Sequence, residues 1–364
     1  MIKNKALAGI TFAAAALLLA ACSQGTSDTA TGADEGTVAE ATGTKPAPFD
    51  AGPVKIAIVQ NSGAGDYFQQ WTNGANKQAE AIGFEVQIYD AQADNAKQAT
   101  DMETAIGSGV AGIIVDHGQA DTMCPLINKA IEAGIPVVVY DVATAECAPK
   151  AVTTQQSDAS LAQAVLDQMA LDLGKDVKVG YVNVLGIAPL DRRHVVWEAI
   201  VKANNWTQSF FVGKFTNSVA TDNAQLVDAA LKKSPDVVGI FAPYDELTKG
   251  TVSGIESNNL QASIKAYGID ISNADIEIMT KEGSPWVATA GTDPNAIGAA
   301  VVRNMALEIA GQLGVRSVDF PGVLITAQFL KDNAVKNMVD LRAKLPELNL
   351  ASVSGADWIP AVKF

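Results

Sequence analysis

The sequence predicts an α/β protein built from two similar doubly wound parallel-sheet units in series. From residue 54 onward, short β-branched runs alternate with amphipathic stretches, which is the pattern of a parallel sheet covered by helices. The same alternation restarts near residue 160. About 310 residues follow residue 53, enough for two domains of ~100–200 residues each.

The first unit begins with a strand over residues 54–59, a run of mostly apolar and β-branched residues. A helix over residues 66–82 follows, with apolar residues at helical spacing, and Gly83 ends it. The other elements expected in this unit are strands over residues 84–89, 112–115 and 136–140 and helices over residues 95–106 and 121–133.

The second unit repeats this order with helices and strands of similar length. Its expected helices cover residues 160–173, 191–203, 222–232 and 246–255, and its strands cover 177–184, 210–212, 237–241, 264–267 and 287–290. A long helix over 294–313 starts with Pro294, where a missing N–H has no cost. A strand over 323–326 and a helix over 331–344 complete the pattern.

The N-terminus has the order of residues of an export signal. Lys3 and Lys5 precede an almost wholly apolar run, which ends in Leu19-Ala20-Ala21-Cys22. This ending resembles the bacterial lipobox, so we expect a signal peptide over residues 1–21 and a lipid on Cys22. A membrane-spanning helix is the alternative, but the run is shorter than the ~20 apolar residues that a span needs.

The segment after Cys22 and the overall charge limit the partners. Residues 22–52 are rich in small and polar residues without apolar periodicity, which predicts a flexible tether. The formal net charge is −14, which argues against nucleic acid or an anionic membrane face as the main partner. Cys124 and Cys147 remain for a disulfide in an exported protein, with two free thiols as the alternative.

Polar and aromatic residues follow the expected strands, at the sheet edge where doubly wound folds bind ligands. Asp116, Asp141 and Asp270 each come directly after or near a strand end. Carboxylates accept hydrogen bonds from hydroxyls, an arginine donates to adjacent oxygens, and aromatic rings cover the apolar face of a sugar. The pattern therefore favours a neutral polyhydroxylated ligand.

Several of these residues have a structural alternative. Asp191 is expected to cap a helix, and Asp245 either caps a helix or binds ligand. Tyr67, Phe68 and Trp71 share an amphipathic helix, where a row of aromatic residues is more often part of the core, but one of them is expected to face the cleft. Trp197 is expected in the core. The two histidines, His117 and His194, are weak indications of a metal or a catalytic site, and no cofactor is expected.

Catalytic and nucleotide-binding motifs are absent from the sequence. It has no G-x-S-x-G, Walker or H-E-x-x-H pattern. Residues 107–112 match G-x-G-x-x-G, but they precede a strand instead of following one, so they are expected to form a turn. An enzyme using Asp116 and His117 remains the least favoured class, because no nucleophile accompanies them.

The order and spacing of these segments resemble the ribose-type periplasmic binding proteins of ABC importers over residues 54–328. The segments that carry the resemblance are Tyr67-Phe68, Ile113-Ile114-Val115-Asp116, Ile135 to Asp141, Arg193 with Trp197, Pro235-Asp236-Val237, Tyr267-Gly268-Ile269-Asp270 and Asp293-Pro294.

The resemblance implies a periplasmic binding protein type I fold, with two lobes joined by a three-segment hinge. The N-terminal lobe would comprise residues 53–155 plus 292–327, and the C-terminal lobe residues 156–291 plus 328–364. The implied crossings lie near residues 153–157, 291–293 and 327–328. The implied ligand contacts are Tyr67, Phe68, Asp116, Asp141, Arg193, Phe215, Tyr244, Asp270 and Thr292, with Asp66, His117 and Asp245 as further contacts.

This chain also departs from the family pattern. Val142 stands where an arginine is usual, Tyr244 where an asparagine is usual, and Thr292 where a glutamine is usual, while Gly65-Asp66 replaces Asn-Pro. These changes favour a different sugar, a polyol or a less polar molecule over ribose.

The function implied is that of an extracytoplasmic, lipid-anchored and monomeric solute-binding protein. It would bind a monosaccharide or polyol between closing lobes and deliver it to an ABC permease. The alternative with the same fold is a receptor that presents a signal molecule to a membrane sensor.

Overall fold

Two six-stranded sheets organise residues 36–364, which are the part of the chain that the computed structural model describes. Each sheet is covered by helices on both faces, so the prediction of two doubly wound lobes is confirmed. The predicted signal peptide and Cys22 lie outside the described residues. No helix in the described part is both long and apolar enough to cross a membrane.

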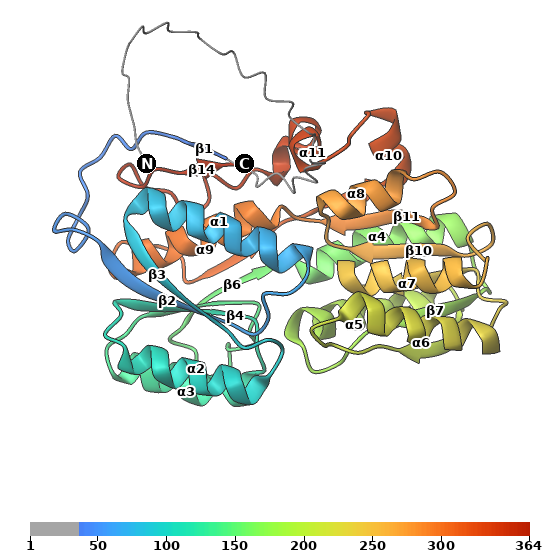
Figure 1. The fold of residues 1–364 in the computed structure, drawn as a ribbon, viewed down its shortest axis with the longest axis horizontal. Helices are drawn as coiled ribbons and strands as arrows, with labels where there is room; N and C mark the ends of the chain where they lie inside the picture. Colours follow the sequence, from blue (N-terminus) through green and yellow to red (C-terminus); the bar gives the residue numbers. More distant parts are fainter. Residues whose placement is uncertain (1–35) are drawn as a thin grey trace, which may run out of the picture. The chain divides into compact units, whose positions relative to one another are not determined.

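The N-terminal lobe contains a fully parallel sheet of order β12-β6-β5-β4-β2-β3. Helices α1 and α9 cover one face, and α2 and α3 cover the other (Figure 1). Its strands are β2 (Val54–Gln60), β3 (Phe84–Asp90), β4 (Gly112–Asp116), β5 (Val137–Tyr140), β6 (Val152–Gln156) and β12 (Ser317–Phe320). Its helices are α1 (Asp66–Ile82), α2 (Asn95–Gly107), α3 (Ala120–Glu132) and α9 (Pro294–Ile309).

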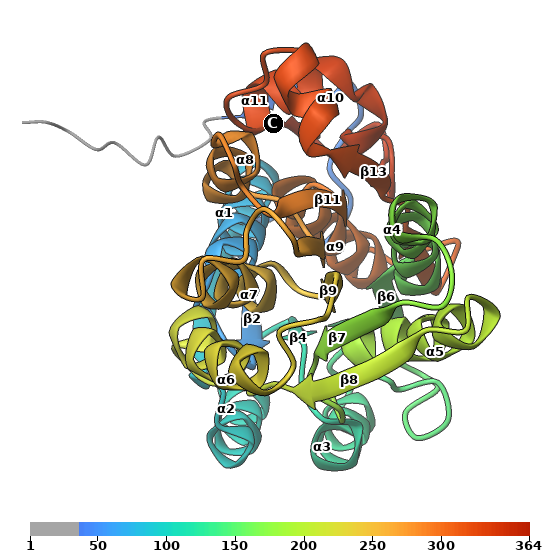
Figure 2. The ribbon, with the colours of Figure 1, turned by 90° about the vertical axis from the view of Figure 1, so that its right-hand side faces the viewer.

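The C-terminal lobe has the sheet order β13-β11-β10-β9-β7-β8, in which only β13 runs antiparallel among the described strands. Figure 2 shows α6 and α7 on one side of this sheet and α4 and α5 on the other. Its strands are β7 (Lys178–Val182), β8 (Thr207–Val212), β9 (Gly239–Ala242), β10 (Lys265–Ile269), β11 (Trp286–Gly291) and β13 (Val323–Thr326). Its helices are α4 (Asp158–Leu173), α5 (Ala188–Ala203), α6 (Val219–Lys233), α7 (Asp245–Ser257), α8 (Asn273–Thr280) and α10 (Ala327–Asp332).

Two glycines allow α1 and α9 to pack closely on the first sheet. A Cβ atom at Gly74 would lie 2.0 Å from the carbonyl oxygen of Asn295, and one at Gly298 would lie 2.1 Å from that of Trp71. Any larger residue would push the helices apart, because these neighbours are backbone atoms. This contact matters for the site because the N-terminus of α1 carries Tyr67 and Phe68.

The chain passes between the lobes at three short segments that follow strands. It leaves β6 for α4 at Ser157, and it leaves β11 for α9 at Thr292 and Asp293. The third passage lies between β12 and β13, at Pro321 and Gly322. This differs from the predicted passage near residues 327–328, because β13 pairs with β11 and so belongs to the C-terminal lobe.

The C-terminal segment adds a fourth passage that the sequence did not indicate. After α11 (Met338–Lys344) and a short 3-10 turn (Pro346–Leu348), the chain returns to the N-terminal lobe. There Arg303 of α9 donates to the backbone oxygens of Leu350 and Val353. Residues 350–364 therefore pack on the N-terminal lobe, whereas from the sequence we expected them in the C-terminal lobe.

The described part of the expected tether is held against this lobe. Strand β1 (Thr37–Val38) pairs antiparallel with β14 (Val362–Lys363), as Figure 1 shows. The Phe49 ring is buried and lies 5.3 Å from the Phe84 ring and 4.9 Å from the Trp358 ring. This segment is thus attached to the lobe by backbone pairing and by one buried ring, although most of its side chains are exposed.

Cys124 and Cys147 are joined by a disulfide, as predicted. It ties the beginning of α3 to the loop after β5.

Several elements differ from the pattern expected from the sequence. Strand β6 and helix α8 were missed, and so was the edge strand β12. The expected helix over residues 331–344 is two short helices, interrupted near Ala334, whose φ is +52°. The expected cap at Asp191 is wrong: α5 begins at Ala188, and the Asp191 carboxylate instead accepts a hydrogen bond from the Gly186 N–H.

Candidate functional site

A cavity of about 230 Å³ lies where the carboxyl ends of the strands of both lobes meet. This is the edge at which doubly wound sheets bind ligands. The volume is below the ~300–1,000 Å³ of sites for drug-sized ligands, so it suits a molecule of monosaccharide size. The polar and aromatic residues that line it are Asn61, Tyr67, Phe68, Asn95, His117, Gln119, Gln156, Arg193, Phe215, Tyr244 and Asp270.

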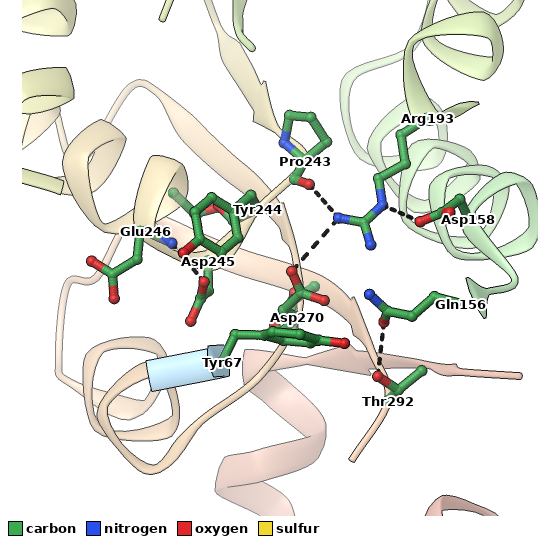
Figure 3. Close-up of polar contacts among 12 residues, drawn as sticks. Tyr67, Gln156, Asp158, Arg193, Pro243, Tyr244, Asp245, Glu246, Asp270 and Thr292 are labelled. Carbon is green, nitrogen blue, oxygen red and sulfur yellow. Dashed lines mark hydrogen bonds and ion pairs between the residues drawn. The ribbon is translucent and has the colours of Figure 1, made fainter. Parts of the chain in front are cut away.

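Arg193 is held at the centre of the site by three acceptors (Figure 3). Its Nε donates to Asp158 Oδ1 at 2.7 Å and its Nη1 to the carbonyl oxygen of Pro243 at 2.6 Å. Nη1 also lies 3.6 Å from Asp270 Oδ2, while the buried Nη2 has no partner among the described residues. The guanidinium therefore has one nitrogen left to donate to a ligand oxygen.

Asp270 supplies a buried acceptor beside this arginine. Its backbone is left-handed, with φ +78°, which places the carboxylate in the cavity at the end of β10. Its Oδ1 has no partner in the described structure. Burial raises the pKa of Asp270, and Arg193 and the nearby Gln156 amide oppose this rise.

Gln156 was not predicted, yet it lines the cavity at the hinge end of β6. The Thr292 hydroxyl donates to Gln156 Oε1 at 2.8 Å, which turns the amide nitrogen away from Thr292 (Figure 3). Thr292, an expected contact, lies outside the cavity wall. Two of the hinge segments therefore fix one amide donor.

Aromatic rings form a continuous wall on both sides of the cleft. The Phe68 ring lies 5.0 Å from the His117 ring and 6.2 Å from the Tyr244 ring, which in turn is 6.4 Å from Phe215. Tyr67 hydrogen-bonds through its hydroxyl to Tyr140. The expected aromatic residues of the site are thus brought together, and rings of this kind pack on the C–H faces of sugars.

The residues after β4 and β5 form a charged group next to the cavity. His117, with φ +57°, lines the wall, and its Nδ1 lies 2.7 Å from Asp116 Oδ1. Its Nε2 lies 3.9 Å from Asp141 Oδ2. Asp116 and Asp141 are buried behind the wall and do not line it.

The pKa values in this group are shifted by burial and by charge. Burial raises the pKa of Asp141 to about 7, and the nearby Asp158 adds to the rise. Burial alone would lower the pKa of His117, but the carboxylates of Asp116 and Asp141 outweigh it and raise the value. The raised pKa favours the cationic form of the imidazole, in which both ring nitrogens donate.

Asp66 and Asp245 also lie outside the cavity wall. Lys249 of α7 contacts both, with its Nζ 2.5 Å from Asp66 Oδ2 and 3.7 Å from Asp245 Oδ2. The same ammonium lies 2.7 Å from Glu246 and 3.4 Å from Asp275. Asp66 therefore joins α1 of one lobe to α7 of the other instead of facing the cavity.

One stretch of apolar residues completes the cavity and was not predicted. It follows β7 and runs into the first turn of α5. Its members that line the wall are Val184, Leu185, Ile187, Pro189 and Leu190. Side chains of this kind cannot bind hydroxyl groups, so this stretch favours an apolar part of the ligand.

No group of histidine, cysteine or carboxylate side chains in residues 36–364 is arranged to hold a metal ion. The chemistry of the wall is instead that of hydrogen bonding and ring contact. Trp71 and Trp197, which share helices with site residues, are both buried in the core.

Comparison with known proteins identifies what the chain is similar to. A family model of the periplasmic binding protein domain matches residues 56–313. Among curated proteins, the ribose import binding protein of Bacillus subtilis (strain 168) is 25% identical over 233 residues, which cover 64% of this chain and 74% of that protein. The D-apiose import binding protein of Paraburkholderia graminis is 24% identical over 235 residues, 60% of this chain and 70% of that protein.

Solved structures share the fold over nearly their whole length. A 5-methylthioribose transporter solute binding protein from Thermotoga lettingae, solved in complex with 5-methylthioribose, is 33% identical, with a TM-score of 0.82. The match covers 84% of this chain and 97% of that one. A sugar ABC transporter protein from Yersinia enterocolitica is 29% identical with a TM-score of 0.83, covering 87% of this chain and 97% of that one.

Proposed function

Because the chain belongs to the ribose-type periplasmic binding proteins, which are extracytoplasmic sugar receptors of ABC importers and not enzymes, we propose a specific ligand class for it. The ligand is a pentose that carries a small apolar substituent, of which 5-methylthioribose is the test compound. The observation that supports this is the division of the cavity wall between hydrogen-bonding side chains and one continuous apolar stretch.

The polar residues match the hydroxyl groups of a pentose. Asp270 Oδ1 and Arg193 Nη2 offer one acceptor and one donor, both buried and both without a protein partner in the described residues. A sugar hydroxyl can donate to the first and accept from the second. His117 and the Gln156 amide add donors on the N-terminal-lobe side.

The apolar residues match a substituent that has no hydroxyl group. Val184, Leu185 and Leu190 line the same cavity as Phe215. Burying one methyl-sized group against such residues favours its carrier by ~1–3 kcal/mol, or roughly 10–200-fold, over a compound that lacks it. The solved relative from Thermotoga lettingae holds 5-methylthioribose, which supports the same class here.

The proposal includes the way the protein is held at the membrane. A lipid on Cys22 would keep a monomeric receptor near its permease, and the order of residues before Cys22 supports it. Labelled fatty acid should be incorporated into the full chain and not into Cys22→Ser; equal labelling of both would contradict the anchor.

The ligand class is tested on protein purified from its native host without added sugar. The protein is denatured, and mass spectrometry identifies what it releases. A pentose with an alkylthio or other small apolar substituent supports the proposal. An unsubstituted hexose, a nucleoside or an amino acid would overturn the ligand class while leaving the family unchanged.

A further inference from the structure

Arg192 stands next to the cavity arginine but faces another surface. It lies outside the cavity wall and lines an open groove beside the disulfide loop. Its side chain is 28% exposed. Nothing about its position in the sequence distinguishes it from a surface arginine on α5.

Its contacts, however, are with two fully buried carboxylates. The Arg192 Nε donates to Asp158 Oδ2 at 2.7 Å, and its Nη2 pairs with Asp141 Oδ1. Asp158 uses its other oxygen, Oδ1, to hold Arg193. One carboxylate at the start of α4 therefore fixes both arginines, each through its own oxygen.

The pair formed with Asp141 joins the two lobes. Asp141 follows β5 of the N-terminal lobe, whereas Arg192 and Asp158 belong to α5 and α4 of the C-terminal lobe. Arg192 occupies Oδ1 of Asp141, so Oδ2 is left without a protein partner and lies 3.9 Å from His117 Nε2. His117 is the residue of this group that reaches the cavity wall.

We propose that Arg192 is a positioning residue for ligand binding, which orients Asp141 across the two lobes and, through it, the His117 ring at the cavity. The inference rests on the proposed function, because it concerns how the same cavity holds its sugar. Ion pairs on an exposed surface contribute little. A buried carboxylate that loses its partner is costly, and Asp141 is such a group.

Charged and titratable groups approach Asp141 from every element around it. They are Asp158 on α4, Arg192 and Arg193 on α5, Asp116 and His117 after β4, Tyr140 on β5 and Tyr67 on α1. Of these, the two arginines and His117 favour the ionised form of Asp141, and Asp158 opposes it. Removing Arg192 should therefore leave more Asp141 protonated at neutral pH.

The test compares Arg192→Gln and Arg192→Lys with a matched control. Arg316→Gln removes an arginine that is 49% exposed and pairs with Glu308 within one lobe. The affinity for 5-methylthioribose is measured by calorimetry, and the association and dissociation rates are measured by stopped-flow tryptophan fluorescence, from pH 6.5 to 8.5.

We expect Arg192→Gln to bind roughly 10- to 100-fold more weakly, mainly through faster dissociation. The loss should shrink toward pH 8.5, where Asp141 ionises without the arginine, and Arg192→Lys should recover part of the affinity. Arg316→Gln should bind like the wild type.

Equal affinity of Arg192→Gln and the wild type across this pH range would overturn the inference about Arg192 but not the proposed function. A loss of affinity in Arg316→Gln as large as that in Arg192→Gln would also overturn only the inference about Arg192. A wild-type protein that binds neither 5-methylthioribose nor any other pentose would instead contradict the proposed function, and the inference with it.

Discussion

Replacing Asp270 by asparagine tests whether the unpartnered buried acceptor of the site binds the ligand. The change keeps the size of the side chain and removes its charge. In the structure Asp270 Oδ1 has no protein partner, and Oδ2 lies 3.6 Å from Arg193 Nη1. Arg193 keeps its stronger contacts to Asp158 and to the Pro243 carbonyl oxygen, so its position should not change.

The expected loss follows from the kind of hydrogen bond that is removed. A hydrogen bond to a charged group contributes ~1.5–3 kcal/mol, whereas one to a neutral group contributes ~1 kcal/mol. The difference is ~0.5–2 kcal/mol, and at ~1.4 kcal/mol for each factor of ten Asp270→Asn should raise the Kd for the sugar roughly 2- to 30-fold.

The ligand-free stability should change in the opposite direction. Burial raises the pKa of Asp270 above its value in the unfolded chain. A carboxyl group with a raised pKa lowers the stability of the fold as the pH rises through that window, so at pH 7 the charge is unfavourable. Asp270→Asn should therefore unfold at the same temperature as the wild type, or at a higher one.

Calorimetric titration with 5-methylthioribose, together with thermal unfolding without ligand, measures both effects. Asp319→Asn is the control, because Asp319 lies exposed on the edge strand β12, away from the cavity. Unchanged affinity in Asp270→Asn with an intact fold would refute the assignment of Asp270 to the ligand. So would an equal loss in the control.

Three further predictions concern selectivity, the disulfide and pH. Leu190→Ala should reduce the preference for 5-methylthioribose over ribose, measured by calorimetry, because it removes part of the apolar wall. Leu171→Ala, at a residue that is 80% exposed, should leave this preference unchanged. The same ratio of the two Kd values in the wild type and both variants would contradict the prediction. Cys124→Ser opens a bridge between residues 23 apart and should cost ~3 kcal/mol in denaturant unfolding, and an unchanged midpoint would be the contrary result. Burial raises the pKa of Asp275 to about 6, so ionisation of this carboxyl group destabilises the fold as the pH rises from about 4 to 6. Asp275→Asn should therefore reduce the fall in unfolding temperature over this pH range. An unchanged dependence of the unfolding temperature on pH would contradict the raised pKa of Asp275.

The sequence predicted the two lobes and much of the cavity because both depend on local patterns. Apolar runs of strand length marked most strands, and ligand residues of a doubly wound fold follow strand ends. Asp270 was predicted in this way, whereas Tyr67, Arg193 and Tyr244 were predicted from the resemblance to the family; all four lie around one cavity. The match to the family agrees with this reading of the fold.

The residues that were missed have no such local signal. Strand β6 has the sequence Val-Thr-Thr-Gln-Gln, with only one aliphatic residue, and it buries the polar residues Thr154 and Gln156. It therefore did not look like a strand, and its cavity residue Gln156 was overlooked. The apolar stretch after β7 resembles an ordinary loop. Only the fold shows that Leu185 and Leu190 line the same cavity as polar residues of both lobes.

Other errors arose from contacts between distant segments. Residues 37–50 have the composition of a tether, but Phe49 packs on Phe84 and Trp358, which come from elsewhere in the chain. Asp66 was likewise predicted as a ligand residue, because it precedes Tyr67 in the sequence. Its carboxylate instead pairs with Lys249, which is 12% exposed and 183 residues away.

The most direct test is calorimetric titration of ligand-stripped wild-type protein with 5-methylthioribose and with ribose under the same conditions. We predict that both sugars bind at one site per chain and that 5-methylthioribose binds at least ~10-fold more tightly, because its methylthio group contacts the apolar wall. Equal or tighter binding of ribose would contradict the role given to that wall, and binding of neither sugar would contradict the proposed ligand class.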